Sequence, residues 1–257
     1  MVDQEVKYLI NLIEEIKYKE WETIFISEDK YLYGIITPPH QKSNLTKWFE
    51  VKTLINSIVY LDRQIKYSFF IAIEHSYSQE IVENFNPHLP PTKRETTSYY
   101  YLENAIFRIS SLWDLLAHIY NVFYEIEIPL NKINYNKFFR LQVDNQYRSS
   151  KRQIKQNLLR IKGLLSPVTE YLNEKDNILI DGRWEGNHSY LNSLRNQLAH
   201  RNALGIPSCS NFSFSMKNHP AFMLKRAIED YNTVSKFILE IAATILVEFE
   251  KEMKLSQ

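Results

Sequence analysis

The chain has 257 residues, of which 44% are hydrophobic and 24% are charged, and its 31 Lys and Arg against 30 Asp and Glu give a net charge of +1. This composition is typical of a folded globular protein with a substantial core, and the balanced charge excludes a global field that attracts polyanions. Five glycines disfavour a glycine-rich nucleotide loop and a β-sandwich, so helices are expected. The single cysteine, Cys209, excludes an internal disulfide and a cysteine-based zinc cluster.

The N-terminal third of the sequence is predicted to be largely helical. In residues 44–85, apolar side chains recur at helical spacing between charged ones, which predicts one long helix or two. The segment 84–98 contains three prolines and many polar residues, so it is predicted to be a loop. We therefore expect a helical extension over residues 1–90, in which residues 21–37 favour a small β-hairpin.

The rest of the chain, residues 91–257, is predicted to be an up-and-down bundle of helices. Apolar residues at alternating steps of four and three predict a long helix over residues 99–126, packed lengthwise on its neighbours. This apolar seam consists of Leu102, Ile106, Ile109, Trp113, Leu116, Tyr120 and Phe123.

Three further helical stretches follow. Residues 147–165 carry an apolar stripe, and Ser166 and Pro167 are expected to be the N-cap and first position of the next helix after a kink. A shorter helix is expected over residues 189–203, and a final helix from about Pro220 almost to the C-terminus. The sequence therefore predicts an all-α protein.

The segment YLNSLRNQLAHRNALG contains the most distinctive side-chain pattern. Arg195 precedes His200 by five positions, a spacing expected roughly 0.3 times by chance here, and Arg183 and His188 repeat it. Asn196, directly after the arginine, lowers the chance expectation of the whole pattern to roughly 0.03. Histidine titrates near neutral pH, and a guanidinium donates paired hydrogen bonds to phosphate oxygens. The pattern therefore indicates a site that handles phosphate.

The motif RNQLAH resembles the Arg-Asn-x-x-x-His signature of the HEPN superfamily, and its setting on a short helix before a final long helix is similar. The resemblance covers roughly residues 99–254 and implies a helical bundle that is often a metal-independent endoribonuclease. By this resemblance His200 is the general acid or base when a ribose 2′-OH attacks the adjacent phosphate. Arg195 then holds the phosphate, and Asn196 orients the histidine or a phosphate oxygen.

The resemblance also implies partners and a setting. RNA is the expected substrate and a homodimer the expected assembly, with no metal and no cofactor. Independently of the resemblance, the single cysteine favours the cytoplasm, and no window approaches the ~20 apolar residues of a membrane span. A toxin or anti-phage defence effector is the implied role, with an antitoxin or regulatory protein as a further partner. Some toxin members carry a modifiable tyrosine two residues after the histidine, but here that position is Asn202. Regulation by that modification is therefore not expected.

Helix geometry bears on how the motif works. On a straight helix Asn196 and His200 share a face, whereas Arg195 and His200 lie about 140° apart. This offset favours a site completed by a second subunit. Three alternatives stay open: an ordinary helix end whose cations complement the helix dipole, an inactive module that binds RNA, a nucleotide or a protein, and a purely structural adaptor.

A stretch without acidic residues carries four cations that form a basic face, and this face is a candidate for RNA binding. The cations are Arg148, Lys151, Arg152 and Lys155. The alternative is an ordinary solvated helix face.

On the long helix of the apolar seam, Glu103 and Asp114 are acids that a bundle would allow to reach the site, and solvent-facing positions are the alternative. Tyr99, Tyr100 and Tyr101 are candidates either to stack on bases or to pack the start of this helix.

Overall fold

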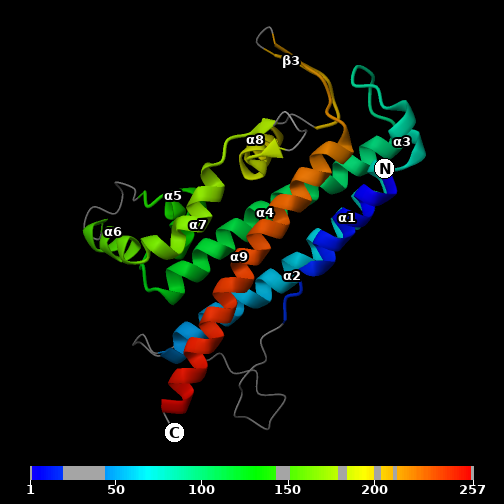
Figure 1. The fold of residues 1–257 in the computed structure, drawn as a ribbon. Coiled ribbons are helices and arrows are strands. Elements are labelled where there is room, and N and C mark those ends of the chain that lie inside the picture. The colour runs from blue at the N-terminus through cyan, green and yellow to red at the C-terminus, as the bar shows by residue number, and fades with distance from the viewer. Residues whose placement is uncertain are drawn as a thin grey trace.

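The structure is a computed structural model that describes residues 2–19, 44–142, 151–178, 184–199, 204–210 and 213–255. Within these residues the chain is almost entirely helical, which confirms the all-α prediction. Four long helices lie side by side along the length of the molecule (Figure 1). They are α1 (Val2–Glu15), α2 (Asn44–Ser76), α4 (Lys93–Phe123) and α9 (Pro220–Leu255). The predicted hairpin at 21–37 lies outside the described residues.

Shorter elements complete the described part of the chain. The helical ones are α3 (Gln79–Asn84), the 3-10 turn η1 (Leu130–Lys132), α5 (Tyr135–Phe139), α6 (Lys151–Arg160), α7 (Lys162–Asn173) and α8 (Asn187–Ala199). Four short strands form two antiparallel pairs: β1 (Asn177–Ile178) with β2 (Trp184–Glu185), and β3 (Ser208–Ser210) with β4 (Ser213–Ser215). The pair β1–β2 leads directly into α8, so it helps to place the helix that carries Arg195.

The hydrophobic core is centred on α4. Every residue of its predicted seam except Phe123 is buried, and α2 and α9 pack against it. The final helix behaves likewise, because the apolar stripe predicted to face inward is buried except for Phe249. Its buried members are Leu224, Ile228, Tyr231, Ile238, Ile241 and Ile245. The helices α1 and α2, which the sequence analysis assigns to an extension, pack into this same core. Among the described residues, no helix combines the length and apolar character needed to cross a bilayer.

The start of α4 differs from the prediction. The helix begins at Lys93 rather than Tyr99, so the predicted loop over 84–98 ends at Thr92. The cause is a capping box: the Thr92 hydroxyl accepts a hydrogen bond from the Glu95 amide, and the Glu95 carboxylate accepts one from the Thr92 amide. The sequence predicts one long helix or two over residues 44–85, and the structure has two, α2 and α3.

The break between α6 and α7 also lies earlier than predicted. It falls at Ile161, and Pro167 sits inside α7 rather than at its first turn. The amides of Leu164 and Leu165 both donate to the Ile161 carbonyl, at 2.9 and 3.2 Å, so the first turn of α7 forms there. Proline has no backbone N–H, so α7 lacks one backbone hydrogen bond at Pro167 and continues beyond it to Asn173.

Candidate functional site

The start of α8 depends on Gly186. Its φ is +69°, in the left-handed region that favours glycine. A Cβ at this position would lie 2.3 Å from the carbonyl carbon of Lys175, so the two backbones meet too closely for any side chain. The Gly186 carbonyl then accepts from the Tyr190 amide at 3.0 Å, in the first turn of α8. The glycine therefore sets where α8 leaves the β1–β2 pair.

A buried arginine of α9 holds the same region. The Arg226 guanidinium is 1% exposed and pairs with Asp176 at 2.6 Å. It also donates to the Glu185 carbonyl and to the side chain of Asn187, each at 2.9 Å, and lies over the ring of Tyr190. One side chain thus connects α9 to β1, β2 and the first turn of α8.

Arg195 lies on the side of α8 that faces α4. Its guanidinium donates to the Ser110 hydroxyl at 2.6 Å and to the Asn196 side-chain oxygen at 3.3 Å. These two bonds orient the group, yet a guanidinium has five N–H donors and the Arg195 side chain is only partly buried. Its hydrogen-bond partners among the described residues, Ser110 and Asn196, occupy only part of this donor set, so Arg195 is held in place while it can still bind an anion.

The other two motif residues have different outcomes. Asn196 is exposed and acts on Arg195, whose orientation its oxygen helps to fix. His200 lies outside the described residues, which leave α8 at Ala199 and resume at Leu204. The roles of both as catalytic residues, and the 140° offset between Arg195 and His200, stay predictions.

Both acids proposed on α4 lie beside α8 and its continuation. Glu103 accepts a hydrogen bond from the Leu204 amide at 3.3 Å, directly after the segment that contains His200. Burial raises the pKa of the Glu103 carboxyl, and the Leu204 amide opposes that rise. Burial also raises the pKa of Asp114, whose charge Arg195 stabilises. Together with Ser110 these acids form a polar stripe on the α8 side of α4.

The raised pKa of Glu103 predicts a pH effect on stability. A carboxyl whose pKa is higher in the folded state contributes stability below its unfolded pKa, and this stability is lost as the pH rises through the folded pKa. Glu103→Gln removes the titration but keeps an oxygen for the Leu204 amide. We therefore expect the variant to gain stability relative to wild type as the pH is raised above about 4, where an ordinary Glu carboxyl loses its proton. Urea unfolding across this range tests it, and a difference that is constant with pH would contradict it.

A buried polar cluster lies beneath Arg195, and the sequence analysis did not find it. The Asp230 carboxylate accepts from the Trp113 indole at 3.2 Å and from the Tyr171 hydroxyl at 2.9 Å. His188 lies between Asp230, 3.5 Å from its Nδ1, and the Tyr135 hydroxyl, 3.1 Å from its Nε2. The sequence signal for this cluster was Asp230 itself, a carboxylate next to the inward-facing apolar stripe of α9.

This cluster forms the floor of the site. Burial raises the pKa of the Tyr135 hydroxyl, and the positive charge of the Arg195 guanidinium opposes that rise. A cavity of about 10 Å³, lined in part by Arg195, Ser110 and His188, has room for one water at most. Any larger ligand must therefore bind on the outer side of Arg195.

Comparison with known families decides the identity of this helical domain. The family model described as HEPN_Cthe2314-like HEPN matches residues 47–249, which is more than half of the chain. The chain belongs to this HEPN family. The match confirms the resemblance seen in the sequence and extends it to α2. Neither the comparison with curated proteins nor that with solved structures gave a match.

The basic face of the HEPN domain is only partly described. Arg152 and Lys155 are exposed on α6, Lys151 is half-buried, and Arg148 lies outside the described residues. Arg160, in the last turn of α6, donates to the backbone beyond the C-terminal end of α4, whereas Arg195 contacts its middle. The basic face and the motif therefore lie at different heights along the bundle (Figure 1). Within the described ranges, no group of three or more His, Cys, Asp or Glu side chains is arranged to hold a metal ion.

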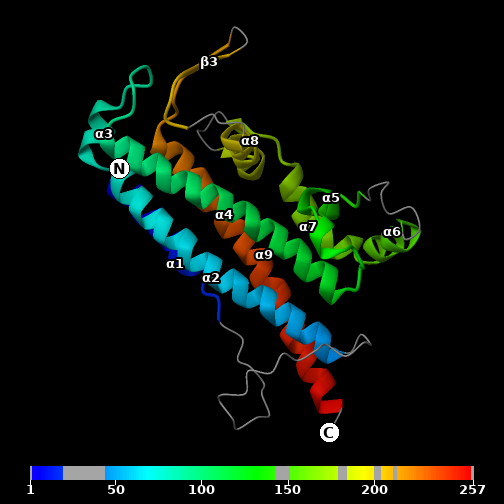
Figure 2. The same cartoon turned by 180° about the vertical axis from the view of Figure 1, so that it is seen from behind.

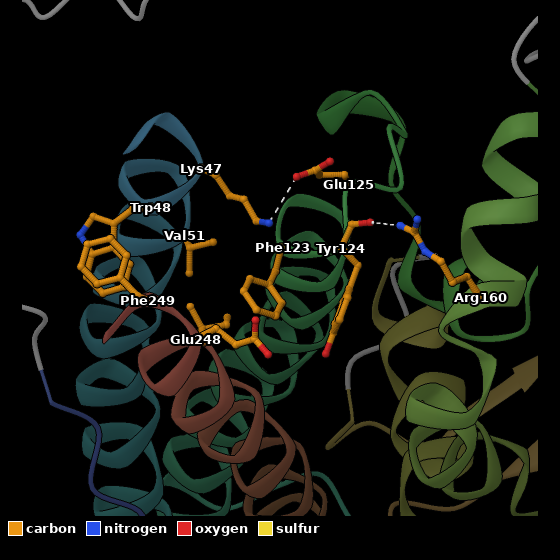
Figure 3. A pocket seen from close by; sticks show the side chains of 10 residues that line it. Lys47, Trp48, Val51, Phe123, Tyr124, Glu125, Arg160, Glu248 and Phe249 are labelled. Carbon is orange, nitrogen blue, oxygen red and sulfur yellow. Dashed lines mark hydrogen bonds and ion pairs between the residues drawn. The ribbon is translucent and has the colours of Figure 1, made fainter. Parts of the chain in front are cut away.

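A larger cavity lies at the other end of α4. It has a volume of about 310 Å³ and is lined by aromatic and charged side chains of α2, α4, α6 and α9 (Figure 3). Its two cations are engaged: Lys47 pairs with Glu125 at 3.3 Å, and Arg160 donates to the Tyr124 carbonyl at 3.1 Å. Two carboxylates, Glu125 and Glu248, also line this cavity, so it is less suited than the site at Arg195 to bind a phosphate.

Proposed function

We propose that this HEPN protein is an endoribonuclease that cleaves RNA by general acid-base chemistry without a metal. The observation that carries the proposal is Arg195, a partly exposed guanidinium oriented by Ser110 and Asn196. A guanidinium held in this way binds two phosphate oxygens and stabilises the charge that develops on them. The HEPN family membership supports the same chemistry.

The reaction uses the ribose of the substrate as its nucleophile. The 2′-oxygen forms a bond to the adjacent phosphorus while the bond from phosphorus to the 5′-oxygen breaks. His200 takes the proton of the 2′-hydroxyl or supplies one to the departing 5′-oxygen, and Arg195 stabilises the phosphate. The products are a 2′,3′-cyclic phosphate and a 5′-hydroxyl. The reaction therefore has two proton transfers, one to a base and one from an acid. A dimer provides two copies of the motif, one for each transfer.

The RNA contacts extend beyond the motif in this proposal. The exposed cations of α6, Arg152 and Lys155, attract the phosphate backbone together with Lys151 and Arg148. The biological role that fits such an enzyme is a toxin or an anti-phage defence effector, restrained by an antitoxin or another regulatory protein.

Cleavage of a defined single-stranded RNA in the presence of EDTA tests the proposal. We expect wild type to produce cyclic phosphate ends and His200→Ala to lose activity, since histidine general catalysis contributes about 10²- to 10⁴-fold. An RNA with a single 2′-deoxy position should resist cleavage at that position only. RNA binding without turnover by wild type would instead identify an inactive HEPN module.

A further inference from the structure

A shallow groove between α2 and α4 is rich in tyrosine and arginine. Its upper part has a volume of about 530 Å³. The lining residues are Tyr60, Arg63, Gln64, Tyr67, Ser68, Tyr100, Tyr101, Asn104 and Arg108. A neighbouring hollow of about 570 Å³ shares Tyr60 and Gln64 with it, so the groove continues along the helices. None of the described residues that line either part is acidic.

The tyrosines of the groove present their rings to solvent. Tyr60 is 65% exposed, and Tyr67 and Tyr100 are each 60% exposed. The ring of Tyr101 stands edge-to-face with Tyr67 at 6.1 Å and with Tyr100 at 5.2 Å. These contacts hold a row of rings whose outer faces lack a partner ring among the described residues. Exposed aromatic faces of this kind are where unpaired bases stack.

An ordered cation accompanies the rings. The Arg108 guanidinium donates to the Gln64 side chain at 2.8 Å and to the Asn104 side chain at 2.9 Å. Arg63 is exposed on the same face of α2, one turn from Tyr60 and from Tyr67. Because no carboxylate lines the groove, its charge complements a phosphate backbone.

The groove and the proposed active site lie on either side of α4. Figures 1 and 2 both show α4 lying between α2 and α8. Tyr100 and Phe107, seven residues apart, are exposed on one stripe of α4, and Phe107 is 44% exposed. On a helix this stripe lies about 60° from Ser110, which contacts Arg195. A strand that crosses α4 from the groove therefore reaches Arg195 over one further aromatic ring.

We infer that the α2–α4 groove binds single-stranded RNA by stacking bases on Tyr60, Tyr67 and Tyr100, and feeds the strand over Phe107 to Arg195. This inference rests on the proposed function and names its substrate as unpaired RNA. A base in a duplex is already stacked and paired, so it cannot lie on these rings.

A second copy of the chain fits the groove less well. In a two-fold symmetric interface the same patch meets itself, which brings Arg63 and Arg108 of both copies together without a carboxylate on either side. Like charges at an interface are unfavourable, whereas RNA phosphates neutralise them.

Fluorescence anisotropy with a 12-nucleotide 2′-O-methyl oligouridylate measures binding without cleavage, because the modification blocks the 2′-hydroxyl. For each ring removed by Tyr67→Ala and Tyr100→Ala we expect affinity to fall at least about fivefold. The matched variants Tyr67→Phe and Tyr100→Phe keep the stacking face and should bind like wild type. A blunt duplex of the same length should bind wild type and the alanine variants equally.

Several results would overturn the inference. These are alanine variants that bind the oligonucleotide as wild type does, phenylalanine variants as weak as the alanine ones, or alanine variants that turn a dimer into monomers by light scattering while keeping RNA affinity. Thermal unfolding of each variant checks that the fold is retained after an exposed ring is removed. If wild type binds through the groove but never cleaves RNA, the proposed nuclease function fails and the groove inference stands. If wild type cleaves RNA and the alanine variants bind and cleave equally well, only the inference fails.

Discussion

Arg195→Ala is expected to lower the rate of RNA cleavage by about 10²- to 10³-fold while leaving the fold intact. The guanidinium is only partly buried, so its loss removes few packing contacts, and the Ser110 hydroxyl that it contacts is itself partly exposed to water. In the proposed mechanism, the variant loses the oriented pair of donors that binds the scissile phosphate. Single-turnover cleavage rates in EDTA, compared with thermal unfolding of the same samples, measure both quantities.

Two further variants separate charge from orientation at this position. Arg195→Lys keeps the positive charge but loses the paired donors, so it should recover only part of the rate. Ser110→Ala keeps the guanidinium but removes the 2.6 Å hydrogen bond that positions it, and should cause a smaller loss than Arg195→Ala. If Arg195→Ala cleaves at the wild-type rate, the guanidinium does not act on the phosphate and the proposed site is wrong.

Arg226→Met is expected to lower the free energy of unfolding by about 3 kcal/mol. The variant removes the pair with Asp176 and leaves the partly buried Glu185 carbonyl and Asn187 side chain without the donor that they share. Asp176 is half-exposed and regains water, which keeps the loss near the lower end of the range for broken buried pairs. Equilibrium urea unfolding measures it.

The adjacent Lys225→Met is the matched control. Lys225 also carries a positive charge on α9, but its ion pair with Glu5 is near the surface at 3.2 Å. Surface pairs contribute about 1 kcal/mol or less, so this variant should remain close to wild type. Equal losses of unfolding free energy for the two variants would show that Arg226 does not anchor the start of α8.

Most helices of this protein follow from local spacing in the sequence. The apolar seam on α4 and the inward stripe of α9 predict two of the four long helices, because burial of one helix face is a local, periodic requirement. The errors occur at helix ends. Thr92 begins α4 through a capping box with Glu95 inside the predicted loop, and Pro167 lies within α7 because the preceding turn forms on Ile161. The position of a helix end depends on a few hydrogen bonds, and these can override the loop that the local composition favours.

In the candidate site too, the sequence predicts the residues that are close together in the chain and not those that come from distant helices. The motif identifies Arg195 and Asn196, since they are adjacent in the sequence, and it predicts a role for His200. Ser110 and Glu103 reach the site from α4, 85 and 101 positions from the residues that they contact. No spacing rule links residues so far apart in the chain.

By itself the sequence determined the helical class and the HEPN motif, and it predicts residues suited to bind phosphate, because each rests on spacing within a few turns of a helix. Only the tertiary structure decided that Ser110 orients Arg195 and that His188 is buried under the site with Asp230. It also placed the tyrosines of α2 and α4 along one groove. These relations depend on how α2, α4, α8 and α9 pack, and packing is settled by the burial of side chains distant in sequence.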